Sequence, residues 1–133
     1  MANEQLVSRR IETARQRLRA ARLLYQEGFN NDALSKSYYA IFAAATALMA
    51  IKGLYSKKHS GVISLFNKNF VKPGLIEHEF GKILAKAQDA RELSDYGDFF
   101  EAGNEETSAQ IESANRFINM ATDYLQRIGY NIA

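Results

Sequence analysis

Long stretches of helical periodicity, interrupted at a few glycines and one proline, constrain this chain more than any other feature. Pro73 is the single proline among 133 residues, and a proline in a helix interior removes a hydrogen bond and kinks or breaks the helix. Glycines stand near the places where the periodic segments stop, at Gly28, Gly53, Gly74, Gly103 and Gly129. This punctuation predicts five helical segments, and the sequence shows no strand pattern, internal repeat or low-complexity tract.

The predicted helices differ in how much of their circumference is apolar. The first and last each have one narrow apolar stripe with polar residues outside it, whereas the second is apolar almost all round and is therefore predicted to be the central helix. We predict a single domain over residues 1–133, an all-α antiparallel up-and-down bundle of four to five helices. The segments span about residues 3–27, 31–52, 60–72, 75–94, and from Asn104 or Thr107 to about 128.

The residue types present exclude several classes of site. There is no cysteine, which rules out disulfides, thiol catalysis and zinc–thiolate centres. Neither His59 nor His78 has an acidic residue at metal-ligand spacing, so we predict no metal and no cofactor. The amino-terminal residues lack a basic stretch before an apolar one, and the longest apolar run, residues 40–47, is too short to span a bilayer. We therefore expect a cytoplasmic protein without a membrane association.

Charge is unevenly distributed although the net charge is only +2. Residues 1–27 contain six arginines against three glutamates, and residues 52–72 contain five lysines and no acid. Residues 73–110 reverse the balance, with nine acidic and three basic side chains. A surface polarised in this way suits an acidic partner at one end, although solvated faces of amphipathic helices produce the same pattern.

A polar cluster, residues 91–96, interrupts the apolar face of the fourth segment. Apolar positions recur there at helical spacing up to Ala87, so the next inward position is Arg91. A guanidinium directed toward a core needs an anion, a phosphate or a partner surface, because an unpaired buried charge costs several kcal/mol. Asp95 stands one turn later and Tyr96 follows it. The cluster is either a structural ion pair, as expected for charges four residues apart on a helix, or a functional site.

Several segments of this chain, in a fixed order, resemble those of the HEPN domain family (higher eukaryotes and prokaryotes nucleotide-binding). They are Ser35-Lys36-Ser37-Tyr38-Tyr39-Ala40-Ile41-Phe42, then Lys58-His59-Ser60-Gly61-Val62, then Phe70-Val71-Lys72, and finally Arg91 with Asp95-Tyr96-Gly97. The resemblance implies a helical bundle that forms a homodimer. It also implies a toxin–antitoxin or stress system with a minimal nucleotidyltransferase as partner, and metal-independent ribonuclease activity in many members.

One part of the ribonuclease pattern of that family is missing. In ribonuclease members an arginine is followed after four to six residues by a histidine, and two such motifs meet across the dimer. Arg91 matches the arginine, but no histidine follows it, and Tyr96 stands five residues later. Metal-free RNA cleavage is served best by groups with a pKa near 7, whereas that of tyrosine is about 10. The departure counts against catalysis and leaves phosphate or nucleotide binding by Arg91.

The candidate residues follow from this comparison. His59 is the one histidine inside a resembling segment, so it is the first candidate acid or base if the fold brings its loop toward Arg91. The candidate catalytic residues are Arg91, Tyr96 and His59. The candidate residues for binding RNA or a nucleotide are Arg91, Asp95, Tyr96, Lys57 and Lys58.

Three functional hypotheses stay open at this point. The chain is a nucleotide- or RNA-binding protein, in one form the ribonuclease toxin of a two-gene system. Alternatively, it is a non-catalytic module that binds a nucleotidyltransferase or itself, in which Arg91 and Asp95 are architectural. In the third hypothesis the hydroxyl of Tyr96 accepts a nucleotidyl group from the partner.

Overall fold

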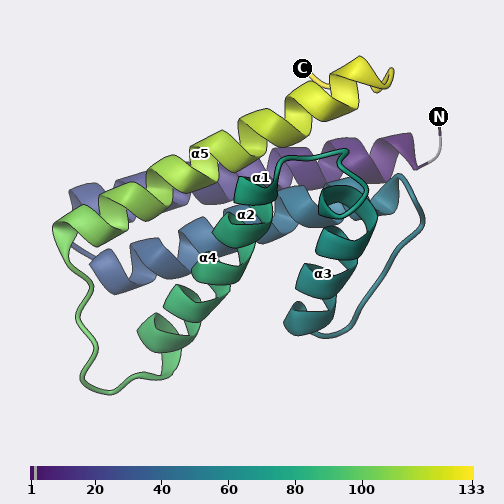
Figure 1. The fold of residues 1–133 in the computed structure, drawn as a ribbon. Helices are drawn as coiled ribbons and strands as arrows, with labels where there is room; N and C mark the ends of the chain where they lie inside the picture. The colour runs from purple at the N-terminus through teal and green to yellow at the C-terminus, as the bar shows by residue number, and fades with distance from the viewer. Residues whose placement is uncertain (2) are drawn as a thin grey trace.

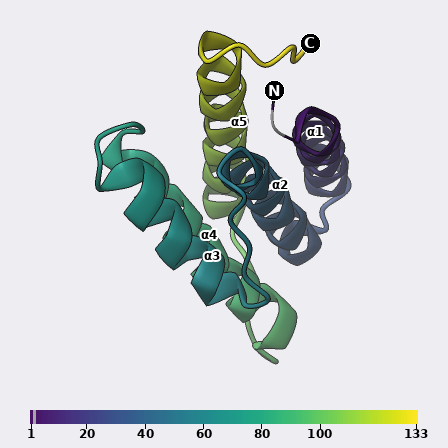
Figure 2. The same ribbon diagram turned by 90° about the vertical axis from the view of Figure 1, so that its right-hand side faces the viewer.

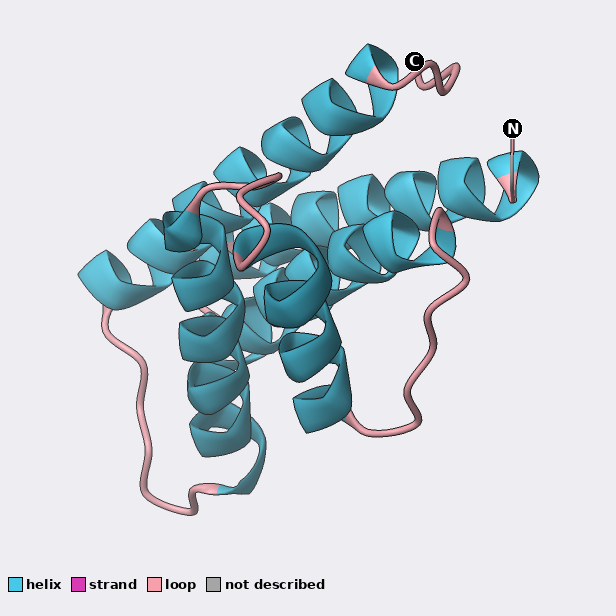
Figure 3. Ribbon diagram, turned by 45° about the vertical axis from the view of Figure 1, so that its right-hand side comes forward, coloured by secondary structure: helices cyan, strands magenta, loops and turns pink. Residues whose placement is uncertain are grey.

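The structure, a computed structural model, describes residues 1 and 3–133. Helices joined by loops make up all of the described chain, in which no strand occurs (Figure 3). This confirms the predicted all-α class. The elements are α1 (Glu4–Gln26), α2 (Asn30–Ala50), α3 (His59–Phe66), the π-helical turn η1 (Asn67–Val71), α4 (His78–Tyr96) and α5 (Asn104–Arg127).

The helices form two groups with different directions. Helices α1, α2 and α5 lie side by side along one direction, whereas α3 and α4 run steeply across them (Figure 1). The view along the first group shows α3 and α4 as a separate pair beside it (Figure 2). Because α3 and α4 are antiparallel to each other, the first residue of α3 and the last residue of α4 lie at the same end of the molecule (Figure 1).

Helix α2 is the central element. It contacts α1, α3, α4 and α5, and its buried residues lie on most of its circumference. Many of them are alanines, and small side chains allow neighbouring helices to approach closely, since the distance between packed helices depends on the side chains at the contact. The fully buried alanines of α2 are Ala33, Ala40, Ala44, Ala45 and Ala47.

Aromatic contacts join the crossing pair to α5. The ring of Phe117 lies 5.5 Å from that of Phe66 on α3 and 6.0 Å from that of Phe80 on α4, between ring centroids. Phe70 in η1 makes an edge contact with Tyr124 at 6.0 Å. Such pairs add specific geometry to the burial of apolar surface, so Phe117 fixes α3 and α4 relative to the rest of the bundle.

The fourth helix begins later than the sequence predicts. The expected start was residue 75, but the N–H groups of Leu75 and Ile76 both donate to the carbonyl of Phe70, each at 3.0 Å. These residues therefore close the preceding turn, and α4 starts at His78. It also extends to Tyr96, two residues beyond the predicted end. In the part of the chain that the structure describes, no helix is both long and apolar enough to cross a membrane.

Candidate functional site

Arg91 is buried near the carboxyl end of α4, where it faces the aromatic side chains of α2. Only 9% of the residue is exposed. Its guanidinium carbon lies 5.4 Å from the ring centre of Tyr38, 5.9 Å from that of Tyr39 and 5.8 Å from that of Tyr96. Guanidinium groups are attracted to aromatic faces within about 6 Å. Three phenol rings from two helices therefore hold the charge in place without neutralising it.

The ion pair that the sequence suggested is present but loose. Nη1 of Arg91 lies 3.6 Å from Oδ2 of Asp95, whereas charge-assisted hydrogen bonds of this type measure about 2.7–2.9 Å. The carboxylate is also the more exposed partner, with 29% of its side chain exposed against 10% for Arg91. Nε of Arg91 is buried and meets no hydrogen-bond acceptor among the described residues. The hydrogen bonding of the guanidinium is thus incomplete in this structure.

His59, the first residue of α3, contacts the same tyrosine. The hydroxyl of Tyr38 is 2.6 Å from Nδ1 of His59. The imidazole ring also stacks on Phe42, with 4.5 Å between ring centroids. Arg91 and His59 both contact Tyr38, so the fold does bring the α3 loop toward Arg91. The condition under which His59 becomes a candidate acid or base is therefore met.

The protonation states of this cluster follow from burial and from the charge of Arg91. Burial raises the pKa of Tyr38 far above that of a free phenol, and the nearby Arg91 charge opposes this only in part. Burial and then Arg91 lower the pKa of His59, against the opposing effects of the neighbouring Gln88 side chain and the charge of Glu92. At neutral pH the phenol therefore keeps its proton and the imidazole is neutral. The hydrogen bond between the Tyr38 hydroxyl and Nδ1 of His59 therefore joins two neutral groups.

Arg91 stays protonated in this environment. Burial lowers its pKa, but the surrounding tyrosines and Asp95 more than compensate, so that the net pKa lies above the ordinary value for arginine. Asp95 supplies the carboxylate that lies against the guanidinium. Arg91 is consequently a permanent, nearly buried cation.

The remaining candidate residues are exposed. Tyr96 ends α4 rather than lying in the following loop, and 72% of it is exposed although its ring contacts Arg91. Lys57 and Lys58 are exposed and directly precede His59. The structure therefore gathers Arg91, His59 and Tyr96, while the two lysines lie at the same end of the molecule without an ion pair among the described residues.

Sequence reasoning missed four contributors to the site. Tyr38, Tyr39, Phe42 and Gln88 were not among the candidate site residues. Tyr38 is the residue that connects His59 and Arg91. Gln88 stands three residues before Arg91, so the two share a face of α4. That spacing was the signal that could have identified Gln88, whereas the reach of Phe42 to His59 depends on where the loop places α3.

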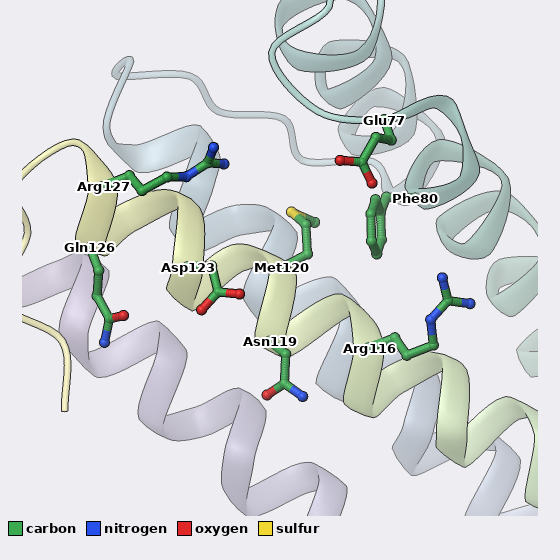
Figure 4. A pocket seen from close by; sticks show the side chains of 8 residues that line it. All are labelled: Glu77, Phe80, Arg116, Asn119, Met120, Asp123, Gln126 and Arg127. Atoms are coloured by element: carbon green, nitrogen blue, oxygen red, sulfur yellow. The ribbon is translucent and has the colours of Figure 1, made fainter.

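A groove of about 710 Å³ lies elsewhere. It runs between the start of α4 and the second half of α5 (Figure 4). Its Arg116 is already paired with Glu79 at 2.6 Å and lies over Phe80. None of the candidate residues lines it. In the described parts of the chain, no three histidine or acidic side chains are grouped so as to hold a metal ion.

Comparisons with known proteins agree on one family. A family model described as HEPN domain matches residues 7–124. Putative toxin MJ0605 of Methanocaldococcus jannaschii is 37% identical over 118 residues, which cover 89% of this chain and 87% of that protein. A UPF0332 protein of Thermotoga maritima is 37% identical over 106 residues, 80% of each chain. Putative toxin MJ0142 of M. jannaschii is 33% identical over 115 residues, covering 86% of this chain and 78% of that protein.

Proposed function

Because the chain belongs to the HEPN domain family, we propose that it is the toxin-like component of a two-protein system and that its Arg91 site binds a phosphate group of RNA or of a nucleotide. The toxin role is supported by two relatives that are named as toxins. A minimal nucleotidyltransferase is the proposed partner, and the cytoplasm the proposed compartment.

The observation that supports phosphate binding most directly is the incomplete pairing of Arg91. A buried charge costs several kcal/mol unless ion pairing and hydrogen bonds offset the lost hydration. Here the carboxylate is 3.6 Å away and Nε has no acceptor among the described residues. A phosphate presents several acceptor oxygens and binds guanidinium groups in the bidentate manner that Asp95 does not achieve here. Such a ligand would complete the hydrogen bonding of Arg91.

The chemistry of the site favours binding over RNA cleavage. Cleavage without a metal requires a base to remove the 2′-OH proton and an acid to protonate the leaving oxygen. Nδ1 of His59 is engaged by the Tyr38 hydroxyl, and burial and the Arg91 charge lower the pKa of this imidazole, so it is a weaker base than a free histidine. The site therefore offers a cation to a phosphate but only a weakened base.

The second candidate function is a non-catalytic module that binds the nucleotidyltransferase or a second copy of the chain. The ion pair between Arg91 and Asp95 favours this second function. Two opposite charges one turn apart on a helix stabilise it, so the pair can have the purely structural role of fixing the end of α4. The exposure of Tyr96 beside a cation supports a third role, in which the Tyr96 hydroxyl accepts a nucleotidyl group. We propose a homodimer in all three cases. The molecular mass of the purified protein in a sedimentation-velocity experiment would test it.

Binding and cleavage can be tested together with one set of variants. Wild type, Arg91→Ala and Arg116→Ala would be titrated with 5′-labelled single-stranded RNA and with a structured RNA, in EDTA. Arg116 is the matched control because it is an exposed arginine already paired with Glu79. We expect Arg91→Ala to lose at least about tenfold in affinity, the equivalent of about 1.4 kcal/mol, and Arg116→Ala to bind like wild type.

The outcomes of this experiment separate the candidate functions. Equal binding by wild type and Arg91→Ala, with both folded by circular dichroism, would contradict the phosphate site. If Arg91 contacts a phosphate, the salt dependence of binding should also become less steep in the variant, by roughly one released counterion. Cleavage by wild type and not by Arg91→Ala would show that the site is a metal-independent nuclease.

A further inference from the structure

A cavity that contains none of the Arg91 cluster lies between η1 and the first half of α4. Its volume is about 470 Å³, which is within the range of cavities that bind small molecules. Because η1 continues α3, the cavity lies at the end of the α3–α4 pair opposite to the Arg91 site (Figure 1). Its lining includes the small residues Gly81 and Ala85.

Four polar side chains that line this cavity make up what we call the η1–α4 site. Asn67 is the first residue of η1, and Lys72 directly follows η1. His78 and Lys82 lie near the start of α4. Lysine ammonium groups bind phosphate as point charges. The imidazole of His78 has an N–H donor in either protonation state, and the amide nitrogen of Asn67 is a donor as well. The site thus combines two cations with two hydrogen-bond donors.

The charged side chains at the start of α4 are sorted between two faces of the helix. Glu77 lines the groove beside α5 (Figure 4), and Glu79 pairs with an arginine of α5 at 2.6 Å. His78 and Lys82 line the cavity beside η1 instead. None of the described residues in the lining of this cavity is acidic, and neither Lys72 nor Lys82 has an ion pair in the part of the chain that the structure describes. The cavity therefore has a positive potential that no carboxylate in its lining offsets.

Gly81 keeps η1 close to α4 at this place. It is buried, and a Cβ at this position would collide with Oδ1 of Asn67 and touch Cγ2 of Val71. A larger residue would therefore push η1 away from α4 and separate the lysines of the two elements. The element η1 is itself a π-helical turn, a departure from α-helical geometry that is frequent at functional sites. The local backbone thus sets the width of the η1–α4 site.

We propose that the η1–α4 site binds a small oligophosphate, that is, two or more linked phosphate groups, either free or carried by a larger molecule. Such a group concentrates several negative charges in a small volume, which matches two lysines in the lining of one cavity. The phosphates of RNA carry one charge each and are spread along a chain. An oligophosphate is therefore the better occupant.

The η1–α4 site is separate from the site of the proposed function. Lys82 and Arg91 lie about two and a half turns of α4 apart, which is ~13 Å along the axis and on opposite sides of the helix. Arg91 does not line the cavity. One phosphate group cannot contact both residues, so the two sites can be tested independently.

The test is a titration of ¹⁵N-labelled protein with sodium pyrophosphate at constant ionic strength, followed by nuclear magnetic resonance. The amide signals of Gly81 and Lys82 should shift until the site is saturated. The double variant Lys72→Gln with Lys82→Gln should bind at least about tenfold more weakly, because it loses both charge-assisted contacts. Lys86→Gln is the matched control, because Lys86 is an exposed lysine one turn further along α4 that lines a different cavity. All of these lysines are exposed, so the melting temperatures should stay at the wild-type value.

Two further ligands identify the source of the phosphates. Adenosine triphosphate should shift the same amide signals as pyrophosphate, whereas adenosine should leave them unchanged, because the η1–α4 site recognises the phosphate groups. Equal affinity for pyrophosphate and adenosine triphosphate supports a free oligophosphate as the ligand. Tighter binding of adenosine triphosphate supports an oligophosphate carried by a nucleotide. Arg91→Ala should bind pyrophosphate as tightly as wild type.

The other outcomes overturn the inference. If the Gly81 and Lys82 signals of wild type do not shift, or if wild type and the double lysine variant bind pyrophosphate equally, there is no oligophosphate site, and the proposed site at Arg91 is unaffected. Loss of pyrophosphate binding in Arg91→Ala assigns the ligand to the Arg91 site instead. A shift with adenosine as large as that with adenosine triphosphate assigns recognition to the nucleoside. If the double variant loses affinity for single-stranded RNA while wild type ignores pyrophosphate, the two lysines serve RNA binding.

Discussion

The hydroxyl of Tyr38 lies 2.6 Å from Nδ1 of His59, so a fully buried tyrosine of α2 fixes the first residue of α3. We expect Tyr38→Phe to lower the free energy of unfolding by about 1 kcal/mol, because a partly buried imidazole nitrogen loses its hydrogen-bond partner while the ring packing stays. Urea denaturation gives the value. Tyr55→Phe, at a residue that is 72% exposed, is the control. Equal stability of the two variants would show that the bond contributes nothing to the fold.

His59 should make stability depend on pH. Its pKa is lower in the folded protein than the usual value of about 6.5, through burial and the Arg91 charge. The unfolded chain therefore takes up the proton more readily. The contribution of His59 is fully present above about pH 6.5 and is lost as the pH falls toward the folded pKa.

Melting temperatures over about pH 5–8 would check this. Wild type should lose stability on acidification more steeply than His59→Gln, which cannot take up the proton. His78→Gln removes the other histidine and serves as the matched variant. Parallel curves for wild type and His59→Gln would mean that the imidazole is equally basic in both states.

The pairing of Arg91 with Asp95 should prove energetically weak. A double-mutant cycle with Arg91→Met and Asp95→Asn is expected to give a coupling of about 0.5 kcal/mol, because the carboxylate is 3.6 Å away and partly solvated. Arg91→Met alone should be neutral or stabilising, because an apolar side chain of similar length removes a buried charge. A coupling above about 2 kcal/mol, the scale of strongly interacting pairs, would instead identify the pair as architectural.

Asn31 should control the order of the α4–α5 connection. Asn31→Ala removes two hydrogen bonds to the loop backbone, each worth about 1 kcal/mol. We expect the loss to be local, with faster hydrogen exchange at the Ala102 amide and unchanged exchange at Val62 in α3. If the Ala102 amide exchanged at the wild-type rate, the Asn31 side chain would not be what orders this connection.

The helices and the site were predictable to different degrees, for physical reasons. Helical periodicity and glycine punctuation located all five helices, because burial of an apolar face leaves a regular signature in the sequence. Arg91 was recognisable for the same reason, as a charge at an inward position of that pattern. Its position beside Asp95 followed from helix geometry alone.

The sequence did not predict that α3 and α4 cross α2. The contact of His59 with Tyr38 depends on that crossing and on a loop whose path has no periodic signal. The start of α4 was predicted too early because the N–H groups of Leu75 and Ile76 donate to the carbonyl of Phe70 in η1. These two residues therefore close the preceding turn and do not belong to α4.

The crowding of phenol rings around Arg91 makes the site spectroscopically visible. The chain contains seven tyrosines and no tryptophan, and three of those tyrosines, Tyr38, Tyr39 and Tyr96, contact the guanidinium. Much of the aromatic circular dichroism and ultraviolet absorbance of the native protein therefore originates at this one place. A ligand that enters the cluster will change the near-ultraviolet spectrum without a label, while the far-ultraviolet signal of the helices stays constant.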